Sequence, residues 1–255
     1  MLKILICILA GLGAGLGTGF AGMSAAAVIS PMLIAFLDMD PYMAVGIALA
    51  SDVLASAVSA VTYGRNKNLD VKNGLVMMAA VLCFTALGSF VASIVPKTTM
   101  GNFSVIMTLL LGIKFIVKPV VAPKQCLTDA TTAQKVIRSL LGGALVGFIC
   151  GFVGAGGGMM MLLVLTSLLG YELKTAVGTS VFIMSVTALT GAVSHFAIGG
   201  LPDITALIVC VVSTLLFAQI AALFANRAQP KTLNRITGAV LVVLGAAILV
   251  VNFCK

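Results

Sequence analysis

Asp52 is a carboxylate inside an apolar segment and could therefore do chemistry there. It lies about ten residues into a hydrophobic block over residues 42–63. A carboxylate near the middle of a membrane helix costs roughly 2.5–3.5 kcal/mol on insertion scales, so it needs a partner, a proton or a function. One helical face would carry this carboxylate with further polar residues at spacings of four, three and four: Asp52, Ser56, Ser59 and Tyr63. We expect this polar face to point into a helix bundle.

Three roles are open for Asp52. As a proton carrier it would be neutral while an anion is bound, and it would couple transport to the proton gradient. As a Na⁺ ligand it would need further oxygens, which Ser51, Ser56 and backbone carbonyls offer. As a structural group it would hydrogen-bond to a helix end. An ionised Asp52 would repel an anion, so we expect it to lie beside an anion site and not within it.

His195 is the only histidine and lies near the end of a block over residues 174–197. It is either a satisfied residue at the membrane interface or a pH-sensitive gate. Tyr63 lies at the related position of the block that contains Asp52. We therefore group Asp52, Tyr63 and His195 as candidates for coupling or gating.

Three hydroxyl residues follow two copies of Ala-Val-Gly at comparable depth: Ser51, Thr179 and Ser180. They either donate to a bound anion or bond back to their own helices. Gln219, in a later block, is expected to bridge two helices. One buried carboxylate and one distant histidine form no acid–base pair, so we expect no enzymatic activity, catalytic residue, metal site or cofactor.

The composition places these residues in a membrane. The 255 residues are 61% hydrophobic and 9% charged, whereas soluble domains are roughly 45–50% apolar and about 25% charged. The formal net charge is +8, but the Lys and Arg residues lie in short clusters between apolar blocks, as in cytoplasmic loops and not as on a nucleic-acid-binding face. We predict an all-α integral membrane protein of the cell (inner) membrane, in contact with the lipid bilayer.

The chain is a duplication with an offset of 132 residues. The glycine pattern of residues 11–22 returns at residues 143–154, and Ala44-Val45-Gly46 returns as Ala176-Val177-Gly178. The predicted organisation is a first membrane repeat, a cytoplasmic linker and a second membrane repeat, over residues 1–121, 122–135 and 136–255.

Each repeat contains five apolar blocks, which predict helices. In the first repeat they cover residues 2–21, 23–37, 42–63, 72–95 and 101–121. In the second they cover residues 136–153, 156–170, 174–197, 204–226 and 233–253. A span needs about 20 residues, and the second block of each repeat is shorter. With the block before it, that block forms either two crossings or a re-entrant or broken hairpin, which gives 8–10 membrane segments.

The positive charges set the orientation. If the chain changes sides at every block, one side receives all of the 15 Lys and Arg residues except Lys3, Lys97 and Lys255. The positive-inside rule makes the richer side cytoplasmic, so both termini are predicted on the extracytoplasmic side. Each repeat then crosses the membrane an odd number of times, and the two copies are inverted. Inverted repeats with interrupted helices are typical of secondary transporters.

Glycine-rich stretches mark the expected breaks. Residues 154–158 read Gly-Ala-Gly-Gly-Gly between two apolar blocks. A flexible linker is excluded there, because backbone N–H and C=O groups cannot be left without hydrogen bonds in lipid. A phosphate loop is excluded because no Lys-Ser or Lys-Thr follows the glycines. The remaining interpretation is a bend that opens a half-helix near Met159, whose first N–H groups carry partial positive charge. The related stretch of the first repeat runs from Gly22 to Pro31 and includes Ser24. Two such helix starts, facing each other, would bind a small anion.

Other glycines have the four-residue spacing that favours close helix packing: Gly11, Gly15, Gly19, Gly143, Gly147 and Gly151. That spacing is absent at positions 156–158, where substrate binding is favoured. The candidate substrate-binding residues are Gly22, Ser24, Ala25, Ser51, Gly156, Gly157, Gly158, Thr179 and Ser180.

The glycine motif, followed after four residues by a proline, in both halves of a duplicated membrane protein resembles the sulfite exporter TauE/SafE family of anion permeases. The resemblance covers essentially the whole chain and includes the Ala-Val-Gly copies, Asp70 and Asp203. The two repeats depart from the family's motif in complementary ways. The first repeat keeps Pro31 but has Ser24-Ala25-Ala26 in place of glycines. The second repeat keeps the glycines but has Leu163 at the proline position. The resemblance implies transport of sulfite, sulfonates or other small organic anions.

Together these features predict a transporter of a small anion, such as sulfite, an organosulfonate or a related sulfur-containing or carboxylate anion, that works by alternating access. Coupling to protons or Na⁺, the direction of transport and the oligomeric state are left open. The alternative is an uncoupled anion channel or a membrane scaffold subunit. No nucleic-acid partner is expected.

Overall fold

The computed structural model describes residues 2–92, 132–153 and 157–229, with short pieces between residues 109–117 and 231–250. All regular secondary structure in this part of the chain is helical. In chain order the helices are α1 (Leu2–Ala21), α2 (Ala26–Leu37), α3 (Pro41–Arg65), α4 (Val71–Ala92), α6 (Thr132–Val153), α7 (Gly157–Ser167), α8 (Leu173–Gly199) and α9 (Ile204–Arg227).

These helices confirm eight of the predicted apolar blocks within a few residues at each end. The largest differences are at α6, which begins at Thr132 inside the expected linker, and at α2, which begins at Ala26 after a longer irregular stretch than expected. The half-helix expected near Met159 begins at Gly157. The blocks expected at residues 101–121 and 233–253 lie mostly outside the described residues.

Four of the described helices are long and apolar enough to cross a membrane: Leu2–Ala21, Met43–Arg65, Leu173–Ala197 and Ile204–Arg227. By contrast, α2 has 12 residues and α7 has 11, which is roughly 18 Å or less of helix against about 30 Å of hydrocarbon. Each of these short helices packs against the long helix before it, α2 on α1 and α7 on α6. The two pairs are therefore helical hairpins with one incomplete arm.

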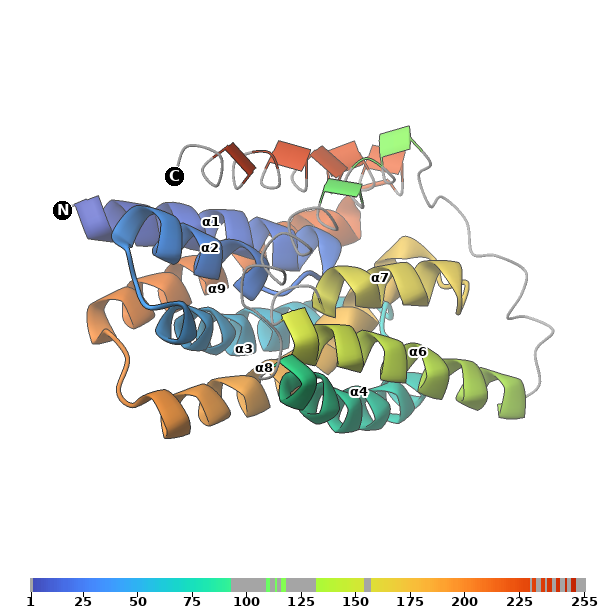
Figure 1. Cartoon of the computed structure of the whole chain (residues 1–255). Helices are drawn as coiled ribbons and strands as arrows, with labels where there is room; N and C mark the ends of the chain where they lie inside the picture. The colour runs from blue at the N-terminus through green and yellow to red at the C-terminus, as the bar shows by residue number, and fades with distance from the viewer. Residues whose placement is uncertain are drawn as a thin grey trace.

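The helices pack mainly between the two halves of the chain. α1 lies along α9, α6 lies along α4, and α3 pairs with α8 in the middle of the bundle (Figure 1). Further contacts join α3 with α9 and α4 with α8. The first helix of each half thus packs against the last long helix that is described in the other half.

Glycines make these cross-half contacts possible. A Cβ added to Gly11, Gly15 or Gly19 would lie 2.5–2.6 Å from the nearest atom of α9. At Gly143 and Gly147 it would lie 2.7 and 2.5 Å from carbonyl oxygens of α4. The prediction that these glycines serve close helix packing is confirmed; the surroundings of Gly151 lie outside the described residues.

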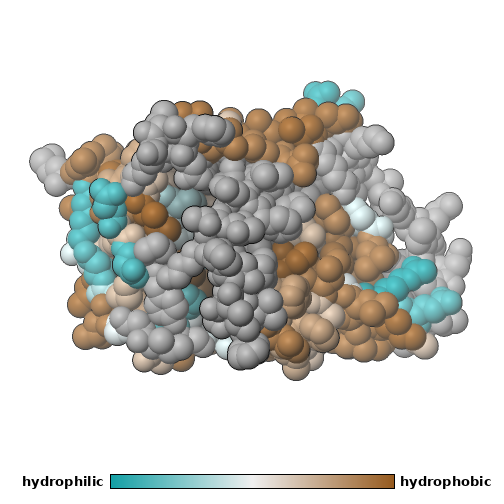
Figure 2. All heavy atoms as spheres, viewed as in Figure 1, coloured by the Kyte–Doolittle hydropathy of each residue, from teal (hydrophilic) through white to brown (hydrophobic). Residues whose placement is uncertain are grey.

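The surface has the character of a membrane protein. Apolar residues cover most of the described surface in view, and hydrophilic residues gather toward the left and right ends (Figure 2). Large apolar side chains such as Leu141, Val193 and Ile220 are more than half exposed. Such a belt is suited to lipid.

Candidate functional site

The helical structure is interrupted between α1 and α2, at Gly22. The φ of Gly22 is +61°, in the left-handed region that favours glycine. The Thr18 hydroxyl donates to the Met23 carbonyl oxygen at 3.0 Å and so satisfies a backbone group within the break. The Ser24 Oγ accepts a hydrogen bond from the N–H of Ala26 at 3.3 Å, in the first turn of α2. The irregular backbone is therefore enclosed and hydrogen-bonded, as membrane depth requires.

The start of α7 lies against this break. A Cβ on Gly158 would stand 2.4 Å from the backbone nitrogen of Ser24, 2.7 Å from the Cα of Met23 and 2.8 Å from the Gly22 carbonyl oxygen. Backbone atoms cannot yield as a flexible side chain does, so position 158 accommodates only glycine without a shift of one helix start. The structure thus brings together the two helix starts that the glycine motifs marked.

Ser180 of α8 contacts both helix starts. Its hydroxyl donates to the Gly22 carbonyl oxygen at 2.8 Å and lies 3.5 Å from the Gly158 carbonyl oxygen. The side chain is completely buried. Residues of both repeats that the sequence selected for substrate binding therefore meet in one cluster: Gly22, Ser24, Ala25, Gly158 and Ser180.

The Asp52 carboxylate faces this cluster from α3. Its Oδ1 accepts a hydrogen bond from the Ser56 hydroxyl at 2.7 Å, and the Ser24 side chain and the Ala25 backbone also face it. Its Oδ2 has no hydrogen-bond partner among the described residues. We expected Asp52 beside the anion site, and it lies at the start of α2.

The polar face predicted on α3 does point inward. Its members are fully buried: Asp52, Ser56, Ser59 and Tyr63. The related face of α8 is also directed into the bundle, with Ser180, Met184 and Thr187 buried. The carboxylate is present only on α3, so the two faces differ in charge.

Tyr63 and His195 lie at opposite ends of the α3–α8 pair. A Cβ added to Gly178 would lie 2.8 Å from the Tyr63 Cβ, and a Cβ added to Gly46 would lie 3.2 Å from the His195 Cβ. The Tyr63 hydroxyl donates to the Gly19 carbonyl oxygen at 2.8 Å. The His195 Nδ1 lies 3.0 Å from the carbonyl oxygen four residues earlier in its own helix. Both side chains thus have structural contacts, and a gating role stays a prediction.

Of the other predicted binding residues, two bond away from the cluster, one begins α7 and one lies outside the described residues. Ser51 donates to the carbonyl oxygen four residues earlier in α3 at 2.8 Å. The Thr179 Oγ1 accepts a hydrogen bond from the Asp70 N–H at 3.2 Å, at the connection between α3 and α4. Gly157 is the first residue of α7, and Gly156 lies outside the described residues.

Sequence reasoning missed Thr18 and Met23. Thr18 is the only polar side chain in the glycine run of residues 11–22, and this was a signal that could have found it. Met23 folds back onto α1, where its Sδ lies 2.5 Å from the position of a Cβ on Gly17. A methionine in an apolar chain carries no comparable signal.

A polar network closes one end of the helix bundle, where α3 leads into α4. The Asp70 carboxylate accepts hydrogen bonds from the Tyr171 hydroxyl at 2.6 Å and from the Asn73 side chain at 2.7 Å. Partial burial alone would raise the pKa of Asp70, but these bonds and the Asn73 N–H outweigh it and hold that pKa below its ordinary value. The Asn68 side chain donates to the Asn226 side chain at 2.7 Å, which ties the same connection to the end of α9.

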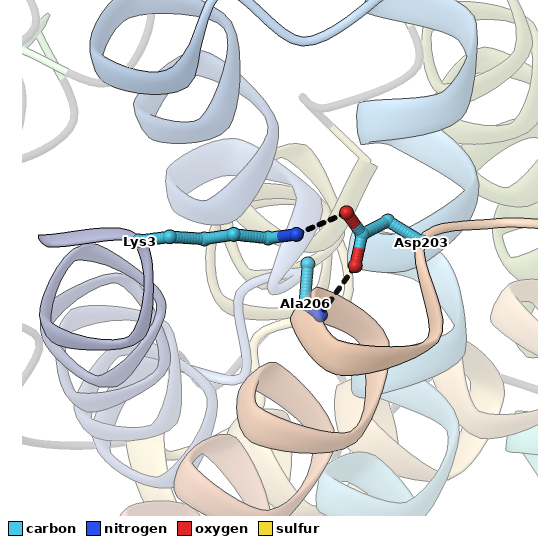
Figure 3. A network of polar contacts seen from close by, with 3 residues as sticks. All are labelled: Lys3, Asp203 and Ala206. Carbon is cyan, nitrogen blue, oxygen red and sulfur yellow. Dashed lines mark hydrogen bonds and ion pairs between the residues drawn. The ribbon is translucent and has the colours of Figure 1, made fainter. Parts of the chain in front are cut away.

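An ion pair lies at the opposite end. Lys3 of α1 reaches across to Asp203, which begins α9 and also accepts a hydrogen bond from the N–H of Ala206 at 3.1 Å (Figure 3). The bond from Lys3, followed by that from the helix backbone, holds the pKa of Asp203 below its ordinary value. Both side chains are more than one third exposed, so water screens this pair.

The chemistry that the cluster offers is that of binding. Among the described residues, no group of three His, Cys, Asp or Glu residues could hold a metal ion. The cluster offers hydroxyls, the positive ends of two helices and one carboxylate that can hold or release a proton. These groups are suited to a small anion and to a proton or a monovalent cation.

Comparison with known proteins identifies the family. The sequence profile of the family described as "Sulfite exporter TauE/SafE" matches residues 7–248. The probable membrane transporter protein YunE of Bacillus subtilis (strain 168) is 25% identical, covering 97% of this chain and 98% of the relative. YdhB of the same organism, also a probable membrane transporter protein, is 24% identical over 89% of this chain and 90% of its own. A third relative, the probable membrane transporter protein MJ0441 of Methanocaldococcus jannaschii, is 22% identical over 96% and 95%.

Proposed function

The chain belongs to the sulfite exporter TauE/SafE family, and on that premise we propose that it carries a small anion through the cell (inner) membrane by alternating access. Members of this family are membrane transporters and not enzymes. The proposed cargo is sulfite, an organosulfonate or a related sulfur-containing or carboxylate anion. Its binding site is the cluster formed by the starts of α2 and α7.

The contact between Gly158 and Ser24 carries this proposal. Both helices begin inside the protein, and the N-terminus of a helix carries roughly half a positive charge. The absence of a side chain at Gly158 lets the two helix starts touch. A Cβ added to Gly158 would lie only 2.4 Å from the Ser24 backbone nitrogen. The Ser24 hydroxyl adds a donor to the same place, and the Ser180 hydroxyl holds the Gly22 carbonyl oxygen beside it. Such a site favours a small anion over a cation or a neutral solute.

The helix contacts support an inverted pair of repeats. The sequence offset pairs α1 with α6, α3 with α8 and α4 with α9. If each helix is replaced by its counterpart in the other repeat, the packing of α1 on α9 becomes the packing of α6 on α4. Both contacts are observed. In the same way the contact of Tyr63 with Gly178 becomes that of His195 with Gly46, and both are observed. A two-fold relationship of this kind suits a transporter in which one repeat moves against the other.

The distribution of charge supports the proposed orientation. Hydrogen bonds at one end join the connection after α3, the start of α8 and the end of α9, through Asn68, Lys174 and Asn226. These are the segments that carry most of the basic residues around the described helices, so we assign this end to the cytoplasm. The opposite end, with Lys3 and Asp203, then faces outward together with the N-terminus. We place the C-terminus on the same outer side.

Substitution of Gly158 tests the proposed site in the reconstituted full-length protein. Gly158→Ala should abolish uptake of sulfite and methanesulfonate into liposomes, because the added methyl forces the two helix starts apart. Gly64→Ala is the matched control, since its Cβ would meet only the Leu69 side chain at 3.3 Å and should leave uptake intact. Ser24→Ala, which removes a hydroxyl without adding volume, should weaken the apparent affinity for the anion.

Three outcomes would contradict the proposal. Wild-type uptake by a correctly inserted Gly158→Ala protein would remove the site from this cluster. Flux that does not saturate and shows no counterflow would favour the channel alternative over a carrier. Absence of flux for every anion tried, in protein that is folded and inserted, would leave a scaffold role.

A further inference from the structure

Among the described residues, the buried Asp52 carboxylate has no cationic side chain as a partner. The side chain is fully buried, its Oδ1 accepts one hydrogen bond from Ser56, and its Oδ2 has none among the described residues. An ionised carboxylate that is buried without a counter-charge is costly, so it must bind a proton or a cation, or face a positive dipole. Which of these applies depends on what surrounds it.

In the part of the chain that the structure describes, no cationic side chain contacts Asp52. Helices α1, α2, α8 and α9 pack against α3, but Lys3 is paired with Asp203 at one end and Lys174 donates to the Asn226 carbonyl oxygen at the other. His195 packs at Gly46, six residues before Asp52 on α3. The groups that face the carboxylate, Ser56, Ser24 and Ala25, are uncharged. The remaining titratable residues of these helices and of α3 are Cys7, Tyr42, Tyr63, Arg65, Cys210 and Arg227.

The positive group that Asp52 does face is the start of α2. The side chain of Ser24 and the backbone of Ala25 are directed toward it, and they are also the residues that offer donors to a cargo anion. A carboxylate at a helix start is stabilised by the helix dipole in the way that a bound anion would be. Two negative charges at this one place would repel each other strongly in a buried setting.

We propose that Asp52 and the cargo anion compete for the start of α2, so that each anion bound requires Asp52 to take up one proton. This inference rests on the proposed function and adds its coupling rule. Without cargo, the ionised carboxylate occupies the positive helix start. When the anion enters, a proton from water joins the carboxylate, and the neutral acid no longer repels the cargo. No bond in the cargo is made or broken, and the proton and anion travel together.

Proton uptake on binding is the direct test. Methanesulfonate is a suitable probe, because its charge does not change over the usable pH range. Its binding to purified full-length protein is measured by calorimetry, and proton uptake by a pH indicator in weak buffer. The wild type should take up about one proton per anion bound, with affinity that falls about tenfold per pH unit once Asp52 is ionised. Asp52→Asn should bind the probe with no proton uptake and no such pH dependence.

The matched control is Asp38→Asn, which removes the same charge from an exposed residue at the end of α2 and should behave as the wild type. Ser56→Ala is a second variant, should Asp52→Asn fail to fold. Loss of its hydrogen bond to the ionised form should move the midpoint of proton uptake to higher pH. This shift is expected only if Asp52 is the group that takes up the proton.

The outcomes separate the two proposals. Anion binding without proton uptake, proton uptake unchanged in Asp52→Asn, or binding that requires Na⁺ in place of a proton would overturn the coupling rule and leave the transport site standing. Failure of methanesulfonate, sulfite and formate alike to bind folded wild-type protein would overturn the proposed function, and the coupling rule with it.

Discussion

Ser180 of α8 donates its hydroxyl to the backbone carbonyl oxygen of Gly22, 2.8 Å away at the break between α1 and α2. This bond joins residues 158 positions apart in the chain. It satisfies a buried carbonyl group where the helical hydrogen-bond pattern is interrupted. The bond therefore fixes the first repeat to the second at the candidate site.

Removal of this hydroxyl should cost stability and function together. Ser180→Ala leaves the Gly22 carbonyl without its donor, which should lower the free energy of unfolding by about 1–3 kcal/mol and weaken anion uptake. Ser185→Ala is the control on the same helix, because Ser185 donates only to the nearby Phe182 carbonyl oxygen at 2.8 Å. Thermal unfolding and liposome uptake check both variants. Equal behaviour of the two alanine variants would contradict a special role for Ser180.

Enlargement of a packing glycine should separate α1 from α9. A Cβ on Gly15 would stand 2.6 Å from the Thr214 carbonyl oxygen and 2.8 Å from the Ala218 nitrogen, and backbone atoms cannot move aside independently. Gly15→Ala should therefore destabilise the protein by about 1–3 kcal/mol, as overpacked cores do. Gly74→Ala, whose Cβ would meet only side-chain atoms at 3.3 Å, should be neutral or slightly stabilising. A Gly15→Ala protein with unchanged melting temperature would show that α1 can shift without cost.

The bond between Tyr171 and Asp70 should make stability depend on pH. Despite partial burial, hydrogen bonds hold the pKa of Asp70 below its ordinary value of 3.8. This contribution to stability is therefore complete above about that value, and it is lost as pH falls through the lowered pKa. Tyr171→Phe should cost about 1 kcal/mol at pH 7, and the difference from the wild type should shrink below pH 3.8. Thermal unfolding between pH 7 and pH 3 gives both values.

A double-mutant cycle provides the control for this prediction. In an Asp70→Asn background, the Tyr171→Phe change should cost less, and its cost should not vary with acid pH, because the ionisable partner is gone. A full cost in that background would mean that Tyr171 acts through other contacts.

Gln219 should matter little for transport. Thr62 of α3 donates toward the Gln219 Oε1 at 3.0 Å and also bonds to the Val58 carbonyl oxygen at 3.0 Å. The contact bears out the expectation that Gln219 bridges two helices. Gln219→Leu should lower stability by about 0.6 kcal/mol, the average for such bonds in membranes, and leave anion affinity unchanged. A large loss of affinity in this variant would extend the site toward α9.

The apolar pattern and the glycine motifs predicted the helices and many residues of the candidate site. Long apolar blocks predict α1, α3, α8 and α9, since backbone groups in lipid must be satisfied within a helix. The four-residue spacing of Gly11, Gly15 and Gly19 identifies a packing face, because residues at this spacing lie on one side of a helix. The duplicated motifs selected Gly22, Ser24 and Gly158, and these residues do meet.

The packing of the helices against one another determines which polar groups lie together. Sequence spacing relates residues within a helix, but it carries no distance between helices. Ser51 and Ser180 therefore had equal standing in the sequence, yet Ser51 bonds back to its own helix and Ser180 reaches the Gly22 carbonyl oxygen in the other half. For the same reason the sequence placed Asp52 at mid-helix but not at the start of α2. That position depends on how α2 and α3 pack, and it places a buried carboxylate at the helix start that would hold an anion.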